Sequence, residues 1–257
     1  MNKINNQYNY KKFSDKSPLV IFIHGAGCDY TFWGMLNRYY FFKGYSTLAI
    51  NLPGHGDNND KGLSSIDEMA LYVKKIVKKY STKKNVLIGH SMGSLICLSI
   101  IINKLFNADK VVLIGVAFPM KVSKSLLELS KKDSSEAISN MINWSLSSDS
   151  KLRGSHLIGL NLPNFINTLM YKAENNLFSD LNSCDKYIVE DAALNKIENS
   201  ILIIAGKLDI MTPLKSSYLL NSILKNSSLE TIEHCGHFHL HEKPEDVRKL
   251  INKYIEN

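Results

Sequence analysis

Short, continuous runs of apolar residues, separated by longer stretches with helical periodicity, constrain the fold of this chain more than any other feature. A run that is apolar at every position is typical of a strand buried on both faces. Such runs alternate here with helix-like stretches, which indicates an α/β fold with a mainly parallel central sheet and helices on both faces. The expected strands are residues 19–23, 46–50, 86–88, 111–114, 201–205 and 229–232.

The alternation is interrupted between the fourth and the fifth of these strands. Residues 118–196 contain no convincing strand and have a helical pattern, with apolar residues recurring on one side of residues 137–144. We therefore expect an α/β core made of residues 1–117 and 197–257. Residues 118–196 are expected to form a helical cap, or lid, inserted into that core.

Charge and cysteine usage narrow the class of protein. The net charge is +7, but arginine is scarce and the lysines are spread along the chain, so we expect a solvated surface and no nucleic-acid partner. The N-terminus lacks the apolar core of a signal peptide, and no stretch is apolar enough to span a membrane. The four cysteines have no paired spacing, which suits a reducing compartment. We expect a cytoplasmic protein that acts on a small molecule.

Ser91 lies in a Gly-x-Ser-x-Gly pattern, Gly89-His90-Ser91-Met92-Gly93. In this pattern a serine occupies a strained turn between a strand and a helix, so that its hydroxyl points away from the sheet. The two glycines let the strand and the helix pack closely. An apolar strand-like run precedes the pattern and an apolar helix-like run follows it, as this arrangement requires. Ser91 is therefore the predicted nucleophile.

Three segments together resemble the α/β-hydrolase superfamily, and within it the small serine esterases and carbon–carbon bond hydrolases. The turn at Ser91 is similar to their nucleophile elbow, residues 24–27 (HGAG) resemble their oxyanion loop, and residues 52–56 (LPGHG) resemble a later turn. The resemblance implies an α/β-hydrolase fold. It also implies that the backbone N–H groups of Ala26 and Met92 form the oxyanion hole, which stabilises negative charge on the reacting carbonyl oxygen.

A serine nucleophile needs a base to take its proton and an acid to orient that base. In α/β hydrolases the acid and then the histidine follow the serine along the chain. Asp209 follows the strand expected at 201–205, at the sheet edge where sites of α/β proteins form. Its surroundings resemble the G-x-x-D-x-x-x-P segment of the family. We expect Thr212 to cap the next helix, which leaves Asp209 free to act as the acid.

His237 is the predicted base, because it follows a glycine just after the last expected strand, as in the Gly-His loop of the family. His234 is expected at the end of that strand, and His239 and His241 are expected to face the last helix or solvent. These histidines are only two or three residues apart, unlike the separated ligand pairs of tetrahedral zinc sites. We therefore expect no metal.

The sequence thus predicts a serine hydrolase that cleaves a small or medium acyl ester through an acyl-enzyme on Ser91, without a cofactor. The same triad also suits a thioesterase, a carbon–carbon bond hydrolase, a perhydrolase or an acyltransferase. A small-molecule receptor and a lysine-rich protein of nucleic-acid or membrane surfaces remain open, as does the oligomeric state. Candidates for an apolar pocket lining are Phe32, Trp33, Phe118, Met120, Met141, Trp144 and Phe238.

Overall fold

The structure, a computed structural model, describes residues 3–80, 82–153 and 161–256. Within these residues the strands form one eight-stranded sheet in the order β1-β2-β4-β3-β5-β6-β7-β8. The first two strands join the edge in antiparallel pairs and the other six strands are parallel, which confirms the expected fold class. The strands are β1 (Lys3–Ile4), β2 (Tyr8–Lys11), β3 (Leu19–Ile23), β4 (Ser46–Ile50), β5 (Asn85–His90), β6 (Lys110–Ile114), β7 (Ser200–Gly206) and β8 (Ser227–Ile232).

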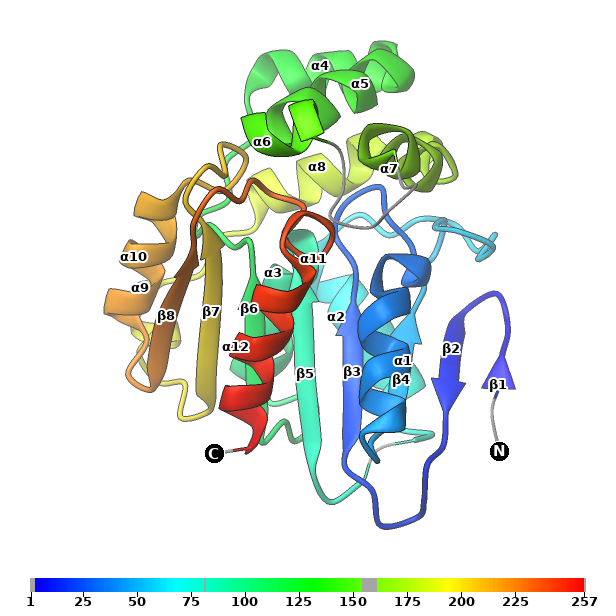
Figure 1. The fold of residues 1–257 in the computed structure, drawn as a ribbon, viewed down its shortest axis with the longest axis vertical. Coiled ribbons are helices and arrows are strands. Elements are labelled where there is room, and N and C mark those ends of the chain that lie inside the picture. The colour runs from blue at the N-terminus through cyan, green and yellow to red at the C-terminus, as the bar shows by residue number, and fades with distance from the viewer. Residues whose placement is uncertain (1–2, 81, 154–160, 257) are drawn as a thin grey trace.

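Helices cover both faces of the sheet because alternate side chains of its buried strands point in opposite directions. In β3, Ile21 and Ile23 pack into one apolar cluster, whereas Val20 and Phe22 pack into another. The first cluster includes residues of α2 (Ile66–Val77), α3 (Met92–Ile102) and α10 (Leu214–Ile223). The second includes residues of α1 (Gly34–Phe42) and α12 (Pro244–Glu256), which lie on the near face in Figure 1.

The chain between β6 and β7 forms helices, which Figure 1 shows mainly beyond the carboxyl ends of the strands. We call α4 to α8 the inserted helices. That these helices act as a separate cap remains a prediction. No helix in the described part of the chain is long and apolar enough to cross a bilayer. The helices in this stretch are α4 (Lys124–Lys132), α5 (Ser134–Ser145), α6 (Ser148–Arg153), α7 (Leu162–Tyr171), α8 (Leu177–Lys186) and α9 (Asp191–Leu194), with the 3₁₀ turn η2 (Glu174–Asn176).

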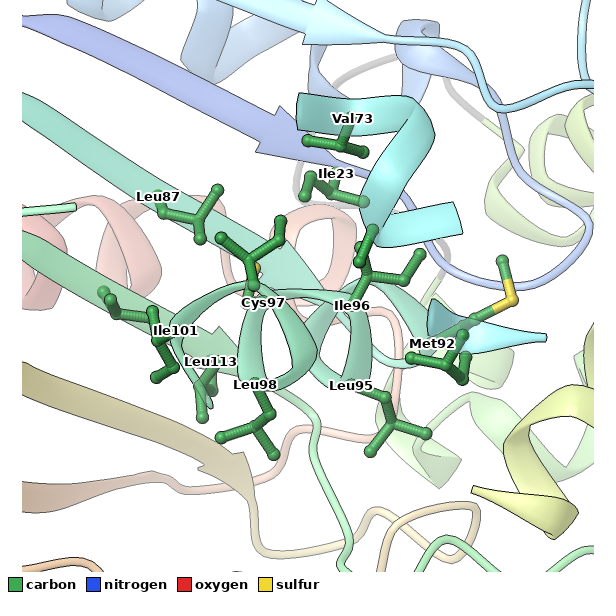
Figure 2. Packing of buried hydrophobic residues seen from close by; sticks show 14 of the residues in the cluster. Ile23, Val73, Leu87, Met92, Leu95, Ile96, Cys97, Leu98, Ile101 and Leu113 are labelled. Atoms are coloured by element: carbon green, nitrogen blue, oxygen red, sulfur yellow. The ribbon is translucent and has the colours of Figure 1, made fainter. Parts of the chain in front are cut away.

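Helix α3 is the central helix of the fold, buried at every position from Met92 to Ile101. Figure 2 shows its apolar side chains packed among Ile23 of β3, Leu87 of β5 and Val73 of α2. A helix that is apolar on all sides belongs in the interior of a protein, because no face of it is suited to water. Its N-terminus is therefore held firmly under the carboxyl edge of the sheet.

The start of α3 approaches β3 so closely that only glycine fits at position 93. A Cβ at Gly93 would overlap the carbonyl oxygen of Ile23 and lie 2.7 Å from the carbonyl oxygen of His24. Both obstacles are backbone atoms, which cannot move aside as a flexible side chain can.

Replacement of Gly93 by alanine is therefore expected to lower the free energy of unfolding by about 1–3 kcal/mol, because β3 and α3 must separate. Urea unfolding followed by circular dichroism measures the change. Gly34→Ala is the matched control, since nothing lies within 4 Å of a Cβ there. The control should leave stability unchanged or raise it by up to about 1 kcal/mol. Equal stabilities for Gly93→Ala and the wild type would contradict the close packing.

Candidate active site

The site residues gather where the connections from neighbouring strands leave in opposite directions. From β3 the chain continues to β4 on one side, whereas β5 pairs with β3 on the other side. Such a switch point leaves a crevice at the carboxyl ends of the two strands. Residues 24–27 follow β3 and Ser91 follows β5, so both lie at this crevice.

Ser91 occupies a strained turn between β5 and α3. Its φ of 52° and ψ of −119° are unusual for a residue with a side chain. Two backbone hydrogen bonds fix the turn: the Ser91 N–H donates to the Ile114 carbonyl at 2.9 Å, and the Ser91 carbonyl accepts from the Ser94 N–H at 2.8 Å. Ser91 is only partly buried and lines a cavity. The turn thus exposes the hydroxyl-bearing side chain at the end of a rigid helix.

Asp209 lies in the loop after β7, is 4% exposed, and accepts four hydrogen bonds. Its Oδ1 accepts from the backbone N–H groups of Met211 and Thr212, both at 2.9 Å. Its Oδ2 accepts from the Thr212 hydroxyl at 2.6 Å and from Nδ1 of His237 at 2.8 Å. Burial raises the pKa of the Asp209 carboxyl, but the charge and hydrogen bond of His237, with help from His239 and Thr212, hold it well below its ordinary value. The carboxylate therefore stays ionised.

The prediction that Thr212 caps the following helix was wrong. Helix α10 begins at Leu214, after Pro213, and has no side-chain cap. The Thr212 hydroxyl instead donates to Asp209. The Asp209 carboxylate accepts hydrogen bonds from the backbone N–H groups of Met211 and Thr212, because a buried carboxylate needs hydrogen-bond donors.

The backbone of His237 is fixed on both sides. Its N–H donates to the Ser145 carbonyl at 2.6 Å, and its carbonyl accepts from His90 Nε2 at 2.9 Å and from His239 Nδ1 at 2.6 Å. The ring donates its Nδ1–H to Asp209, which leaves a lone pair on Nε2. An imidazole in this tautomer can accept a proton at Nε2.

His239 and His241 are buried, so neither faces solvent, which was one of the two surroundings expected for them. His239 is fully buried, and its Nε2 lies 4.0 Å from Asp209 Oδ2. His241 packs against the rings of Phe32 and Phe165, with centroids 4.9 and 5.0 Å away. Burial lowers the pKa of both imidazoles, that of His241 to about 4. The two rings are buried because the short helix α11 (His239–Glu242) turns this segment back into the protein.

The sequence analysis assigned no role to Glu242, which is fully buried at the end of α11. Its Oε2 accepts from the Ser147 N–H and the Ser150 hydroxyl, both at 2.9 Å, and from the Gly236 N–H at 3.2 Å. Its Oε1 accepts from the Phe238 N–H at 3.2 Å. The carboxylate therefore joins the turn between α5 and α6 to the two residues that flank His237. Nothing in the local sequence marks this role.

Residues 24–27 lie directly beside the nucleophile. A Cβ at Gly25 would lie 3.1 Å from the Ser91 Cβ and 3.0 Å from His90 Nδ1. Ala26 lines the same cavity as Ser91. The side chain of Met92 is buried in the core (Figure 2), and its backbone N–H opens α3 immediately after Ser91. The role of these two N–H groups as an oxyanion hole remains a prediction.

A cavity of about 250 Å³ lies between these loops and the inserted helices. Ser91, His237 and Ala26 all line it. Four of the expected apolar residues also line it, whereas Phe32, Trp33 and Phe118 pack in the core. Its apolar lining comprises Cys28, Met120, Val122, Leu126, Met141, Trp144, Met170, Leu181, Cys184, Ile210, Met211 and Phe238.

One lysine lies at this cavity, and its charge is directed elsewhere. Lys121 is 57% exposed, donates to the Asp185 carbonyl at 2.7 Å and lies 3.8 Å from the Asp185 carboxylate. Among the described lining residues no other lysine or arginine is present. The cavity therefore suits an uncharged, apolar group.

The chain is similar to known proteins over most of its length. The sequence profile of a family described as "alpha/beta hydrolase fold" matches residues 18–244. A protein of Mycoplasma pneumoniae named "Putative esterase/lipase 2" is 28% identical, over 92% of this chain and 88% of its own length. The Bos taurus "Protein ABHD8" is 24% identical over 95% of this chain, which spans 57% of that protein. A solved structure titled "Structure of a thermophilic esterase" is 25% identical with a TM-score of 0.79, covering 97% of this chain and 93% of that one.

The Glu242→Gln variant tests whether Glu242 holds the loop of His237. The amide keeps the size of the side chain but replaces one accepting oxygen with a donor that faces N–H groups. We expect the free energy of unfolding to fall by about 2–3 kcal/mol. Urea unfolding measures this change. Glu245→Gln, at an exposed neighbouring acid, should change stability by less than about 0.5 kcal/mol. The assignment fails if both variants are as stable as the wild type.

Proposed function

The chain belongs to the alpha/beta hydrolase fold family, and from this premise we propose that it is a serine hydrolase that cleaves small or medium acyl esters through an acyl-enzyme on Ser91. One observation carries the proposal: the strained Ser91 lines a cavity together with His237, whose ring is hydrogen-bonded to the buried Asp209. The name of the Mycoplasma pneumoniae relative supports an ester as the substrate.

In the first step the Ser91 Oγ attacks the acyl carbon while Nε2 of His237 takes the hydroxyl proton. The Nδ1–H of His237 donates to Asp209, so the carboxylate stabilises the imidazolium as it forms. The imidazolium then gives its proton to the leaving alkoxide, and the acyl group remains on Ser91. In the second step His237 takes a proton from water as the water oxygen attacks the acyl carbon. The imidazolium then returns the proton to the Ser91 Oγ as the bond to Ser91 breaks and the acid is released.

Negative charge develops on the former carbonyl oxygen in both steps. We propose that the backbone N–H groups of Ala26 and Met92 stabilise it. The N-terminus of α3 adds a favourable electrostatic field, because Ser91 immediately precedes its first residue. Backbone donors on a helix buried in the core are rigid, and rigid donors need no reorganisation when the charge appears.

The substrate class follows from the cavity. Its volume of about 250 Å³ lies just below the range of roughly 300–1,000 Å³ that is common for ligand pockets. Four methionines, Met120, Met141, Met170 and Met211, give the lining an adaptable shape. We therefore propose short, uncharged acyl groups, which the inserted helices cover as a cap. The four cysteines are buried and unpaired, which suits the reducing cytoplasm that we propose as the compartment.

Hydrolysis of p-nitrophenyl acetate, butyrate, octanoate and palmitate tests the proposal. We expect kcat/KM to be highest for acetate or butyrate and at least about tenfold lower for palmitate, because a long chain exceeds the cavity. Ser91→Ala should lower kcat by roughly 10⁴-fold or more. A fluorophosphonate probe should label the wild type and leave Ser91→Ala unlabelled.

Other outcomes would replace the proposal. Fast turnover of acyl thioesters with slow turnover of oxygen esters would indicate a thioesterase. Labelling of Ser91 without turnover of any ester would indicate a receptor on this fold. Undiminished ester turnover by Ser91→Ala would exclude Ser91 as the nucleophile.

A further inference from the structure

A third buried carboxylate, Asp180, reaches from the inserted helices to the loop beside Ser91. Asp180 lies in α8 and is 1% exposed. Its Oδ2 accepts from the Gly27 N–H at 2.9 Å and from Nε2 of His55 at 2.7 Å. Gly27 directly follows Ala26, one of the two residues proposed to supply the oxyanion hole. The carboxylate is not part of the triad, yet it is bonded to the neighbour of a proposed catalytic group.

The hydrogen bonds of His55 require a charged ring. Its Nδ1 lies 3.0 Å from the Pro53 carbonyl, and its Nε2 lies 2.7 Å from the Asp180 carboxylate. Both partners are acceptors, so both ring nitrogens must carry a proton. His55 is therefore an imidazolium that forms a buried ion pair with Asp180, and both side chains are 1% exposed.

The neighbouring His24 has the opposite state. Its Nδ1 donates to the Gly25 carbonyl at 2.9 Å, and its Nε2 accepts from the Leu52 N–H at 3.2 Å. A ring in which one nitrogen donates and the other accepts is a neutral imidazole. The two rings are 4.9 Å apart, so a second charge there would repel the first. His24 is therefore the neutral imidazole of the pair, and His55 is the charged one.

The groups around His55 favour its charge. Among the described residues, those that act on it electrostatically are Asp180 of α8, Asp29 before the 3₁₀ turn η1 (Tyr30–Trp33), and His24 after β3. Burial lowers the pKa of His55, but the charge and hydrogen bond of Asp180, with smaller effects of Pro53 and Asp29, raise it above its ordinary value. Burial and repulsion by His55 lower the pKa of His24 to about 3.

We propose that Asp180 is a positioning residue for the oxyanion hole, acting through the Gly27 N–H and the ion pair with His55. The inference rests on the proposed function, since it assigns a second task to the same site. The carboxylate fixes residues 24–27 against Ser91 and ties them to α8, which lines the cavity through Leu181 and Cys184. Asp180 therefore links the position of the inserted helices to that of residues 24–27.

The ion pair gives the site a pH dependence with a definite sign. The pKa of His55 is raised in the folded protein, so the pair is complete below the ordinary histidine pKa of about 6.5. It is lost as the pH rises through the raised pKa, because a neutral His55 cannot donate to both acceptors. Alkaline pH should therefore loosen the loop at Ala26.

The Asp180→Asn variant tests the proposal. It keeps the size of the side chain but removes the charge that holds His55 protonated. We expect kcat for p-nitrophenyl butyrate to fall about 10–100-fold at pH 7 with KM changed less than about twofold, because the oxyanion donors act in the transition state. The kcat of the wild type should fall as the pH rises through the raised pKa of His55, whereas that of the variant should show no such fall. Glu128→Gln, at an exposed acid of α4, is the matched control and should behave as the wild type.

Two nuclear magnetic resonance measurements on Ser91→Ala keep the test independent of turnover, and the first of them is also independent of how well Asp180→Asn folds. The ring nitrogens of His55 should both carry protons at pH 7 and titrate above the ordinary histidine pKa. Addition of Asp180→Asn should speed hydrogen exchange at the Gly27 and Ala26 amides by tenfold or more, on the order expected when a buried hydrogen bond to a charge is lost.

The outcomes separate the two proposals. If the wild type hydrolyses no ester, the proposed function is wrong. The positioning role of Asp180 is then judged by hydrogen exchange and ring titration alone. A folded Asp180→Asn enzyme with kcat within twofold of the wild type overturns the positioning role. A His55 ring that is neutral at pH 6 overturns it as well, whether or not the variant folds.

Discussion

A buried carboxylate must be surrounded by donors, and in this protein that requirement brings together segments that are distant in the sequence. Asp209 joins the loop after β7 to His237, and Glu242 joins the loop of His237 to the turn between α5 and α6. Asp180 joins α8 to the turns that follow β3 and β4. All three lie near the carboxyl edge of the sheet. Hydrogen bonds to these three carboxylates hold the loops around Ser91 in place. The close contact of α3 with β3 at Gly93 provides a rigid base for them.

The parallel part of the sheet could be predicted from the sequence because most of its strands contain a continuous apolar run and are followed by turn residues. The bounds expected for β3 and β4 agree with the structure, and those of the other four parallel strands differ by at most two residues. The short strands β1 and β2 were missed. Tyr8–Lys11 alternates buried and half-buried residues and pairs with β4. This pairing joins distant segments, so the local sequence does not predict it.

The candidate site could be predicted only in part. Ser91, Asp209 and His237 stand next to strand ends, so local sequence was enough to single them out. The partners of Asp180 are 125 and 153 residues away, and Ser147 is 95 residues from Glu242, so no spacing or periodicity reveals these contacts. The burial of His239 and His241 could not be predicted for a similar reason. Alternating polar residues after a strand suggest a surface, whereas here α11 folds beneath the inserted helices and the rings fill the interior.

The attachment of the inserted helices to both loops has a consequence for how such proteins can diverge or be re-engineered. A lid held to its scaffold by apolar contact alone can be exchanged for another lid of similar shape. Here Ser145 and Asp180 belong to the inserted helices, and their hydrogen-bond partners belong to the rest of the chain. A chimera with foreign helices at this place would leave His55 without its carboxylate partner and the His237 N–H without its acceptor. Single substitutions of Met120, Met141 or Trp144, which line the cavity, should therefore change substrate selectivity with less damage to the site than exchange of all the inserted helices.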